Sequence, residues 1–202
     1  MNRLLLLALT LCTSLAFAQA SASSAATSMR LRATIDKIDG GSMTVKERSG
    51  EVVTLLLADA MVVTEVYPIE PGAIQPGAFI GTAAMPRPDG TLDALEVLVL
   101  PESARGNGEG HRPYDLQPGS TMTNATVADL VAAPQGHKLL LRYKDGEKTV
   151  LVSDTTPVVT FRPGDRSLLV VGGKVIVTAE ERNGQPVALR VLAGRNGFAP
   201  PL

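Results

Sequence analysis

The residues best suited to chemistry lie together near the middle of the chain. Glu109, His111 and Asp115 place two carboxylates and one imidazole within seven positions. Oxygen and nitrogen ligands of this kind can bind a divalent cation such as zinc. The only other histidine, His137, follows Gly136 and is expected to be a solvated turn residue. If the fold brought His137 close to His111, a site with two histidines would form.

The same segment supports a plainer interpretation, which we favour. Asp115 and Ser120 would cap turns, while Tyr114 and Leu116 would anchor the segment in a groove between folded modules. In this interpretation the segment is a contact surface for a ligand or a partner. That surface would consist of His111, Tyr114, Asp115, Ser120 and Met122.

Catalysis by these residues is not expected. Ser120 or Thr121, combined with His111 and Asp115, gives the residue types of a hydrolytic triad. The segment nevertheless lacks a nucleophile elbow and any oxyanion-hole signature. We therefore predict a protein that is not an enzyme and that has no cofactor, apart from the divalent cation considered above.

The start of the chain has the pattern of a secretory leader. A short basic start precedes an apolar stretch over residues 4–11, and Ala16-Phe17-Ala18 forms an A-x-A cleavage site. We expect a signal peptide over residues 1–18, with cleavage after 20 as the alternative, and a flexible Ser/Ala-rich arm to residue 28. The single cysteine, Cys12, lies inside this leader, so the mature chain has no thiol chemistry. The prediction is an exported, periplasmic protein without a membrane span.

Composition limits the possible partners. One of the 19 basic residues lies in the leader, which leaves 18 against 20 acidic residues without a block of like charge. A nucleic-acid-binding protein needs a basic surface that displaces counterions, so this function class is excluded. The expected partner is an unidentified protein or small molecule.

The rest of the chain contains one β-rich pattern twice. Thr44-Val45-Lys46 and Val62-Val63-Thr64 have counterparts 96 positions later, at Leu140-Leu141-Arg142 and Val158-Val159-Thr160. Apolar and polar residues alternate in short runs separated by Gly, Pro and Asp-Gly turns, which is typical of strands. No long segment with the helical period and caps occurs. Between Val62 and Gly77 three prolines are expected to interrupt central strand pairing.

These patterns predict an all-β fold of two tandem small barrels, OB-like or SH3-like, with five to six strands each. Closing a small sheet into a barrel removes its exposed edges. A pair of open meanders packed face to face is the alternative. The expected boundaries are module 1 over 29–100, a structured linker over 101–123, module 2 over 124–194 and a tail over 195–202.

The chain also resembles the bacterial domain of unknown function 5666. The resemblance rests on the strand order, on the Pro76-Gly77 turn before the Phe79-Ile80-Gly81 strand, and on residues 108–124, GEGHRPYDLQPGSTMTN. It covers nearly all of the mature chain and implies a periplasmic β-barrel protein without an established activity. Relatives sometimes carry a label as metal transporter permeases, which require several membrane helices.

The function predicted from the sequence is therefore binding or scaffolding in the periplasm, with the contact surface at the linker between the modules. Weak binding or handling of a divalent metal is the first alternative. A structural partner in an envelope assembly is the second, and it would expose an apolar strand edge or patch.

Overall fold

The computed structural model describes residues 28–201, so the predicted leader, its cleavage sites and nearly all of the arm lie outside the described residues. Within this range the fold is all-β, as predicted, and short 3-10 turns are the only helical elements. No helix in the described range is long and apolar enough to cross a membrane. The strands are β1 (Ser28–Asp39), β2 (Ser42–Glu47), β3 (Val52–Pro68), β4 (Phe79–Pro86), β5 (Leu92–Val99), β6 (Gly110–Pro113), β7 (Thr121–Ala133), β8 (Gly136–Tyr143), β9 (Gly146–Val152), β10 (Val158–Pro163), β11 (Lys174–Arg182) and β12 (Gln185–Ala193).

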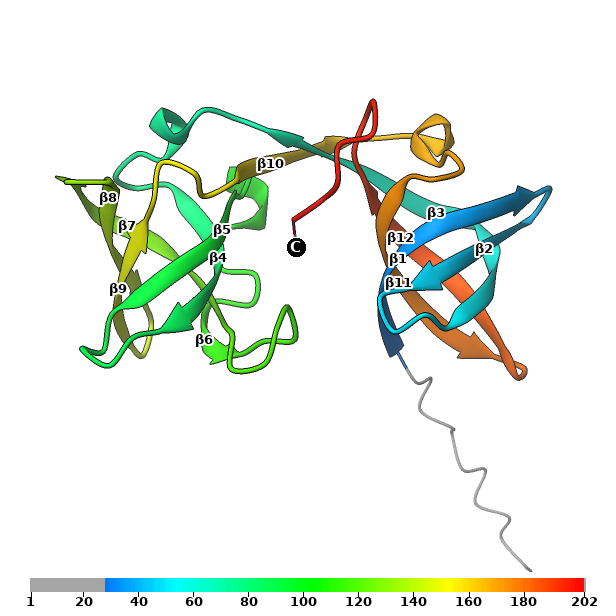
Figure 1. The fold of residues 1–202 in the computed structure, drawn as a ribbon, viewed down its shortest axis with the longest axis horizontal. Helices are drawn as coiled ribbons and strands as arrows, with labels where there is room; N and C mark the ends of the chain where they lie inside the picture. Colours follow the sequence, from blue (N-terminus) through cyan, green and yellow to red (C-terminus); the bar gives the residue numbers. More distant parts are fainter. Residues whose placement is uncertain (1–27, 202) are drawn as a thin grey trace, which may run out of the picture.

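The strands close into two barrels of five strands each (Figure 1). In the first barrel, β12, β11, β1, β2 and β3 follow one another, and parallel pairing of β12 with β3 closes the ring. In the second barrel, β5, β4, β7, β8 and β9 follow one another, and a short parallel pairing of β5 with β9 closes it. The small-barrel fold class is therefore confirmed.

The first barrel is not built from one continuous stretch of chain, and neither barrel has the bounds predicted for the modules, 29–100 and 124–194. The meander β1–β2–β3 is completed by the hairpin β11–β12 from the other end of the chain. The hairpin β4–β5 pairs with the meander β7–β8–β9 within the single stretch 79–152, so the second barrel is inserted between the two parts of the first. Figure 1 shows this insertion, because the first barrel combines blue with orange strands while the second runs continuously from green to yellow.

Two strands, β3 and β10, run between the barrels and connect them. β3 continues for 17 residues, well past the point near Val62 where the sequence pattern was expected to loosen. Its second half pairs in parallel with β12 and antiparallel with β10, from Thr64 opposite Pro163 to Pro68 opposite Val159. Pro68 is tolerated because it is the last residue of the strand, where the ladder ends. β10 in turn pairs in parallel with β5.

Apolar side chains form a core inside each barrel and a third core between them. Met43, Val45 and Leu55 are fully buried in the first barrel, while Leu139 and Leu141 are fully buried in the second. Burial of each such side chain stabilises the fold by roughly 1.5–3 kcal/mol. The core between the barrels contains buried residues of four strands, with partly buried aromatic residues beside them: Val66, Leu98, Val159, Ile176, Phe161 and Phe198.

A buried carboxylate ties the crossing strands together. Glu65 of β3 is 3% exposed and accepts hydrogen bonds from Arg162 of β10 at 2.6 Å and from Arg195, beyond β12, at 3.0 Å. These two guanidinium groups lower the pKa of Glu65 to about 2. Arg162 also lies over the ring of Tyr67, 4.6 Å from its centroid. The charge of Glu65, in the first half of the sequence, is thus compensated by two arginines from the second half.

Strands β1–β5 and strands β6–β12 each contribute to both barrels. We therefore predict that these two halves of the chain fold only together. A protease site inserted after Gly106, in the exposed loop between β5 and β6, would separate β1–β5 from β6–β12. After cleavage in native buffer we expect a 1:1 complex by size-exclusion chromatography with light scattering. Each fragment, once separated in denaturant, should lack a cooperative melt, because each would hold one incomplete barrel of three strands and a separate hairpin. Recovery of two independently folded fragments would contradict this topology.

Candidate functional site: a cleft between the barrels

A cleft of about 370 Å³ lies between the two barrels. This volume falls in the range of small-molecule sites in proteins, about 300–1,000 Å³. Both barrels and the linker contribute to its walls, so the site exists only because the barrels are held side by side. Its lining includes residues of both barrels and of the linker: Arg30, Thr178 and Arg190 of the first barrel, Gly81, Leu98, Met122 and Asn124 of the second, and Arg112 and Tyr114 of the linker.

The wall from the first barrel carries a row of polar side chains. Arg30 of β1 is paired with Thr178 of β11, which is paired in turn with Arg190 of β12. Directly paired residues project from the same face of a sheet, and strands lie about 4.8 Å apart, so the backbones of the two arginines are roughly 10 Å apart. Neither arginine forms an ion pair with a carboxylate of residues 28–201. The row therefore presents two uncompensated positive charges.

The facing wall, from the second barrel, is mainly apolar and has a glycine at its centre. Gly81 of β4 is paired with Leu98 of β5 and with Asn124 of β7. A Cβ atom at Gly81 would lie 2.9 Å from Oδ1 of Asn124, so even alanine would displace that amide. Met122, two residues before Asn124, adds a flexible thioether. The absence of a side chain at Gly81 thus leaves the cleft open.

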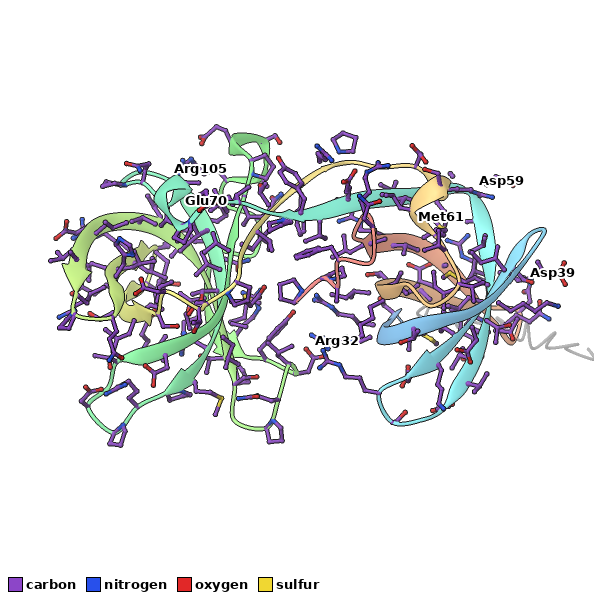
Figure 2. The ribbon with its side chains drawn as sticks, turned by 45° about the horizontal axis from the view of Figure 1, so that its top comes forward. Arg32, Asp39, Asp59, Met61, Glu70 and Arg105 are labelled. Atoms are coloured by element: carbon purple, nitrogen blue, oxygen red, sulfur yellow. The ribbon has the colours of Figure 1, made fainter. Side chains whose placement is uncertain are left out.

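The linker connects the two barrels at the rim of the cleft. The ring of Tyr114 lies under the guanidinium groups of Arg30 and Arg32, at 5.5 and 5.3 Å from its centroid. Asp115 accepts two hydrogen bonds from Arg32, at 2.7 and 2.8 Å. Figure 2 shows Arg32 extending from the first barrel toward the second. Cation–π contacts and a bidentate ion pair therefore join β1 to the linker.

A buried acid lies next to this cleft. Glu96 of β5 is fully buried, and neither carboxylate oxygen has a hydrogen-bond partner of good geometry in residues 28–201, although the backbone of Ala83 is close enough to lower its pKa slightly. It is two residues before Leu98 and so lies on the same face of the strand. Burial raises the pKa of Glu96 to about 8, against smaller lowering effects of Arg30, the Ala83 backbone and Arg32. At neutral pH this carboxyl group is mostly uncharged.

The structure does not bring the three predicted metal ligands together. Glu109 accepts a hydrogen bond from the backbone N–H of Lys144 at 3.1 Å, and Asp115 is paired with Arg32. His111 lies 2.8 Å from the Thr123 hydroxyl through Nδ1, and burial together with Lys148 lowers its pKa. No group of three or more potential ligands occurs within residues 28–201. Only His111 belongs to β6, while Glu109 and Asp115 lie in the loops before and after it, and each has a different partner.

His137 does not join His111 either. His111 is paired with Thr123 and His137 with Ala132, nine positions farther along β7. That separation corresponds to roughly 30 Å of strand. The two histidines are therefore too far apart along the strand to share a metal ion.

The predicted contact residues lie only in part at the cleft. Tyr114 and Met122 line the cleft, whereas His111, Asp115 and Ser120 do not. Ser120 stabilises a turn, as expected, because its hydroxyl lies 2.7 Å from the Gln117 carbonyl oxygen and 3.0 Å from that of Tyr114, and it accepts from the Gln117 backbone N–H. Asp115 was expected to cap a turn and instead pairs with Arg32, a residue 83 positions away that no local pattern links to it.

Sequence reasoning missed Arg30, Arg190 and Glu96. The two arginines alternate with apolar residues in ordinary half-buried strands, and nothing local marks them. Glu96 does carry a signal, since it is the one charged residue in the run Leu95-Glu96-Val97-Leu98-Val99-Leu100. A charged side chain inside such a run is buried on one face or the other and requires an explanation.

Comparisons with protein-family models, with curated proteins and with solved structures find no match to this chain. The resemblance to the domain of unknown function 5666 therefore stays a prediction. The cleft is described by its own geometry alone.

Glu96 should make the protein less stable as pH rises. A carboxyl whose pKa is about 8 in the folded state and near 4.5 in the unfolded state is protonated more readily when folded. The free energy of unfolding then falls between these two pH values by about 1.4 kcal/mol per unit, at most about 5 kcal/mol in total. We expect Glu96→Gln to raise the urea midpoint at pH 8 and to change it little at pH 4.5.

The control for this measurement is Glu51→Gln, at an exposed position, which should follow the wild-type pH profile. If the difference between Glu96→Gln and wild type were the same at both pH values, the carboxyl would not titrate as the structure implies.

Proposed function

We propose that this chain is a non-enzymatic binding protein that holds a small molecule in the cleft between its two barrels. The observation that carries the proposal is the cleft itself, which combines an apolar wall with a few converging polar groups. The secretory leader pattern and the family resemblance support action in the periplasm, after export. A protein that binds without reacting needs a shaped, stable site and no activated nucleophile.

The way the cleft is held supports binding. The two barrels share β3 and β10 and enclose a common apolar core, so the walls face each other before any ligand arrives. A site that is already formed loses less conformational entropy on binding than one that must be ordered by its ligand. The linker adds a second connection across the rim, through Asp115 and Arg32.

A structural role in an envelope assembly is a second candidate, favoured by exposed apolar side chains. Val170 and Val171, in the turn before β11, are 50% and 68% exposed, and Val62 of β3 is 52% exposed. Exposed apolar side chains can take part in contacts with another protein when they lie together. The metal-handling alternative gains no comparable support within residues 28–201, where the predicted ligands lie apart.

Filling the cleft at Gly81 tests the proposed function. The backbone at Gly81 does not have a positive φ, so a larger residue can be introduced without backbone strain. A leucine there would occupy the centre of the cleft. Using the neutral fluorescent probe N-phenyl-1-naphthylamine, we expect saturable binding to wild type and at least about tenfold weaker binding to Gly81→Leu, about 1.4 kcal/mol.

Gly72→Leu is the matched control, because Gly72 has open space around it and no positive φ. This variant should bind the probe like wild type, and thermal melts should show that both variants are folded. No saturable binding to wild type, or equal binding to wild type and Gly81→Leu, would contradict a ligand site in the cleft.

A further inference from the structure

From the charges and the walls of the cleft we infer its ligand class: a small amphipathic anion, with its acid group at Arg30 and Arg190 and its apolar body against Leu98 and Ile176. This inference rests on the proposed function and names the ligand that the site would select. A carboxylate, sulfonate or phosphate monoester attached to a hydrocarbon or aromatic body has this chemistry.

The charge of the cleft is one-sided. Three arginines line it, Arg30, Arg112 and Arg190, and no aspartate or glutamate of residues 28–201 does. Arg112 donates one hydrogen bond to the carbonyl oxygen of Gly108, a neutral partner that leaves its charge uncompensated. The nearest acid at the rim, Asp115, is already held by Arg32. An anion entering the cleft would therefore meet only positive or neutral groups.

Glu96 does not reverse this charge balance. It is buried and does not line the cleft, and its carboxyl group is mostly uncharged at neutral pH. Ionisation of Glu96 at higher pH would place a negative charge near Arg30 and Arg32. Anion binding should therefore be measured near pH 6.5, where the positive charge of the arginines is least compensated.

The arginine row is arranged to hold one anionic group. Arg30 and Arg190 flank Thr178, whose hydroxyl has no partner in the hydrogen bonds of residues 28–201. Guanidinium groups bind carboxylate and sulfonate oxygens through two parallel hydrogen bonds. Two arginines on either side of a hydroxyl can therefore surround a single acid group with donors.

The remaining walls are suited to an apolar body. Leu98 and Ile176 belong to the core between the barrels, and Leu100, Phe161 and Leu192 are partly buried next to them. The same five residues line the cleft. Apolar groups of a ligand would extend this core and remove apolar surface from water, which contributes roughly 25 cal/mol for each Å². Inorganic anions lack such a body and should bind much more weakly.

A matched pair of probes separates the anion inference from the proposed function. 1-Anilinonaphthalene-8-sulfonate has the same aromatic framework as N-phenyl-1-naphthylamine and adds one sulfonate group. At pH 6.5 and low salt we expect the sulfonate probe to bind the full mature chain at least about tenfold more tightly. Arg190→Gln should abolish this preference and change binding of the neutral probe by less than twofold.

Two controls accompany these titrations. Arg142→Gln removes an exposed arginine of β8 that does not line the cleft, and it should leave both affinities unchanged. Gly81→Leu should weaken both probes, which shows that both bind in the cleft. Thermal melts of each variant establish that it is folded, so a change in affinity is not a loss of structure.

The outcomes distinguish the two proposals. Equal affinities of wild type for both probes, or an unchanged preference in Arg190→Gln, would overturn the anion inference while leaving the small-molecule site intact. Saturable binding of neither probe would overturn both. A sulfonate preference that is lost in Arg190→Gln, kept in Arg142→Gln and reduced by added salt would support the inference.

Discussion

The structure depends on the two strands that pass between the barrels. β3 begins in the first barrel and ends beside the second, and β10 pairs with its second half. Each barrel can close only with strands from both halves of the sequence. The positions of the two barrels relative to each other are therefore fixed by backbone hydrogen bonds and not by a flexible linker. A cleft between two such bodies keeps its shape, in contrast to a cleft between domains joined by a single hinge.

Where β3 and β10 run between the barrels, a buried charged side chain needs partners of the opposite charge. Glu65 is buried where β3, β10 and the end of β12 meet, and two arginines neutralise it there. Around it, Val66 and Val159 extend an apolar core that neither barrel contains by itself. The ion pairs define how β3 and β10 are aligned. The apolar side chains supply most of the stability of this region, because a partly exposed ion pair contributes little.

The side chains that line the cleft lie on the outer faces of strands whose inner faces form the barrel cores. Arg30 and Arg190 alternate with core residues such as Leu31 and Val191, so the same strands supply both the core and the polar wall. Gly81 keeps the facing wall open, and Tyr114 brings the linker against the arginines. Glu96 remains the unusual group, because its burial without hydrogen bonds costs stability that the surrounding packing must offset.

The sequence by itself determined the all-β class, most strand positions, the turns and the importance of the linker around Tyr114. These features follow from local rules: alternation for strands, Gly and Asn for positive φ, proline for strand ends. It did not determine which strands share a barrel, and the contiguous modules predicted from it were wrong. Pairing of β1–β3 with β11 and β12 joins residues more than 100 positions apart, and no local pattern encodes that choice. Only the tertiary structure placed Arg30 and Arg190 opposite Gly81, because a binding site between two surfaces depends on how whole sheets meet and not on the spacing of residues within either one.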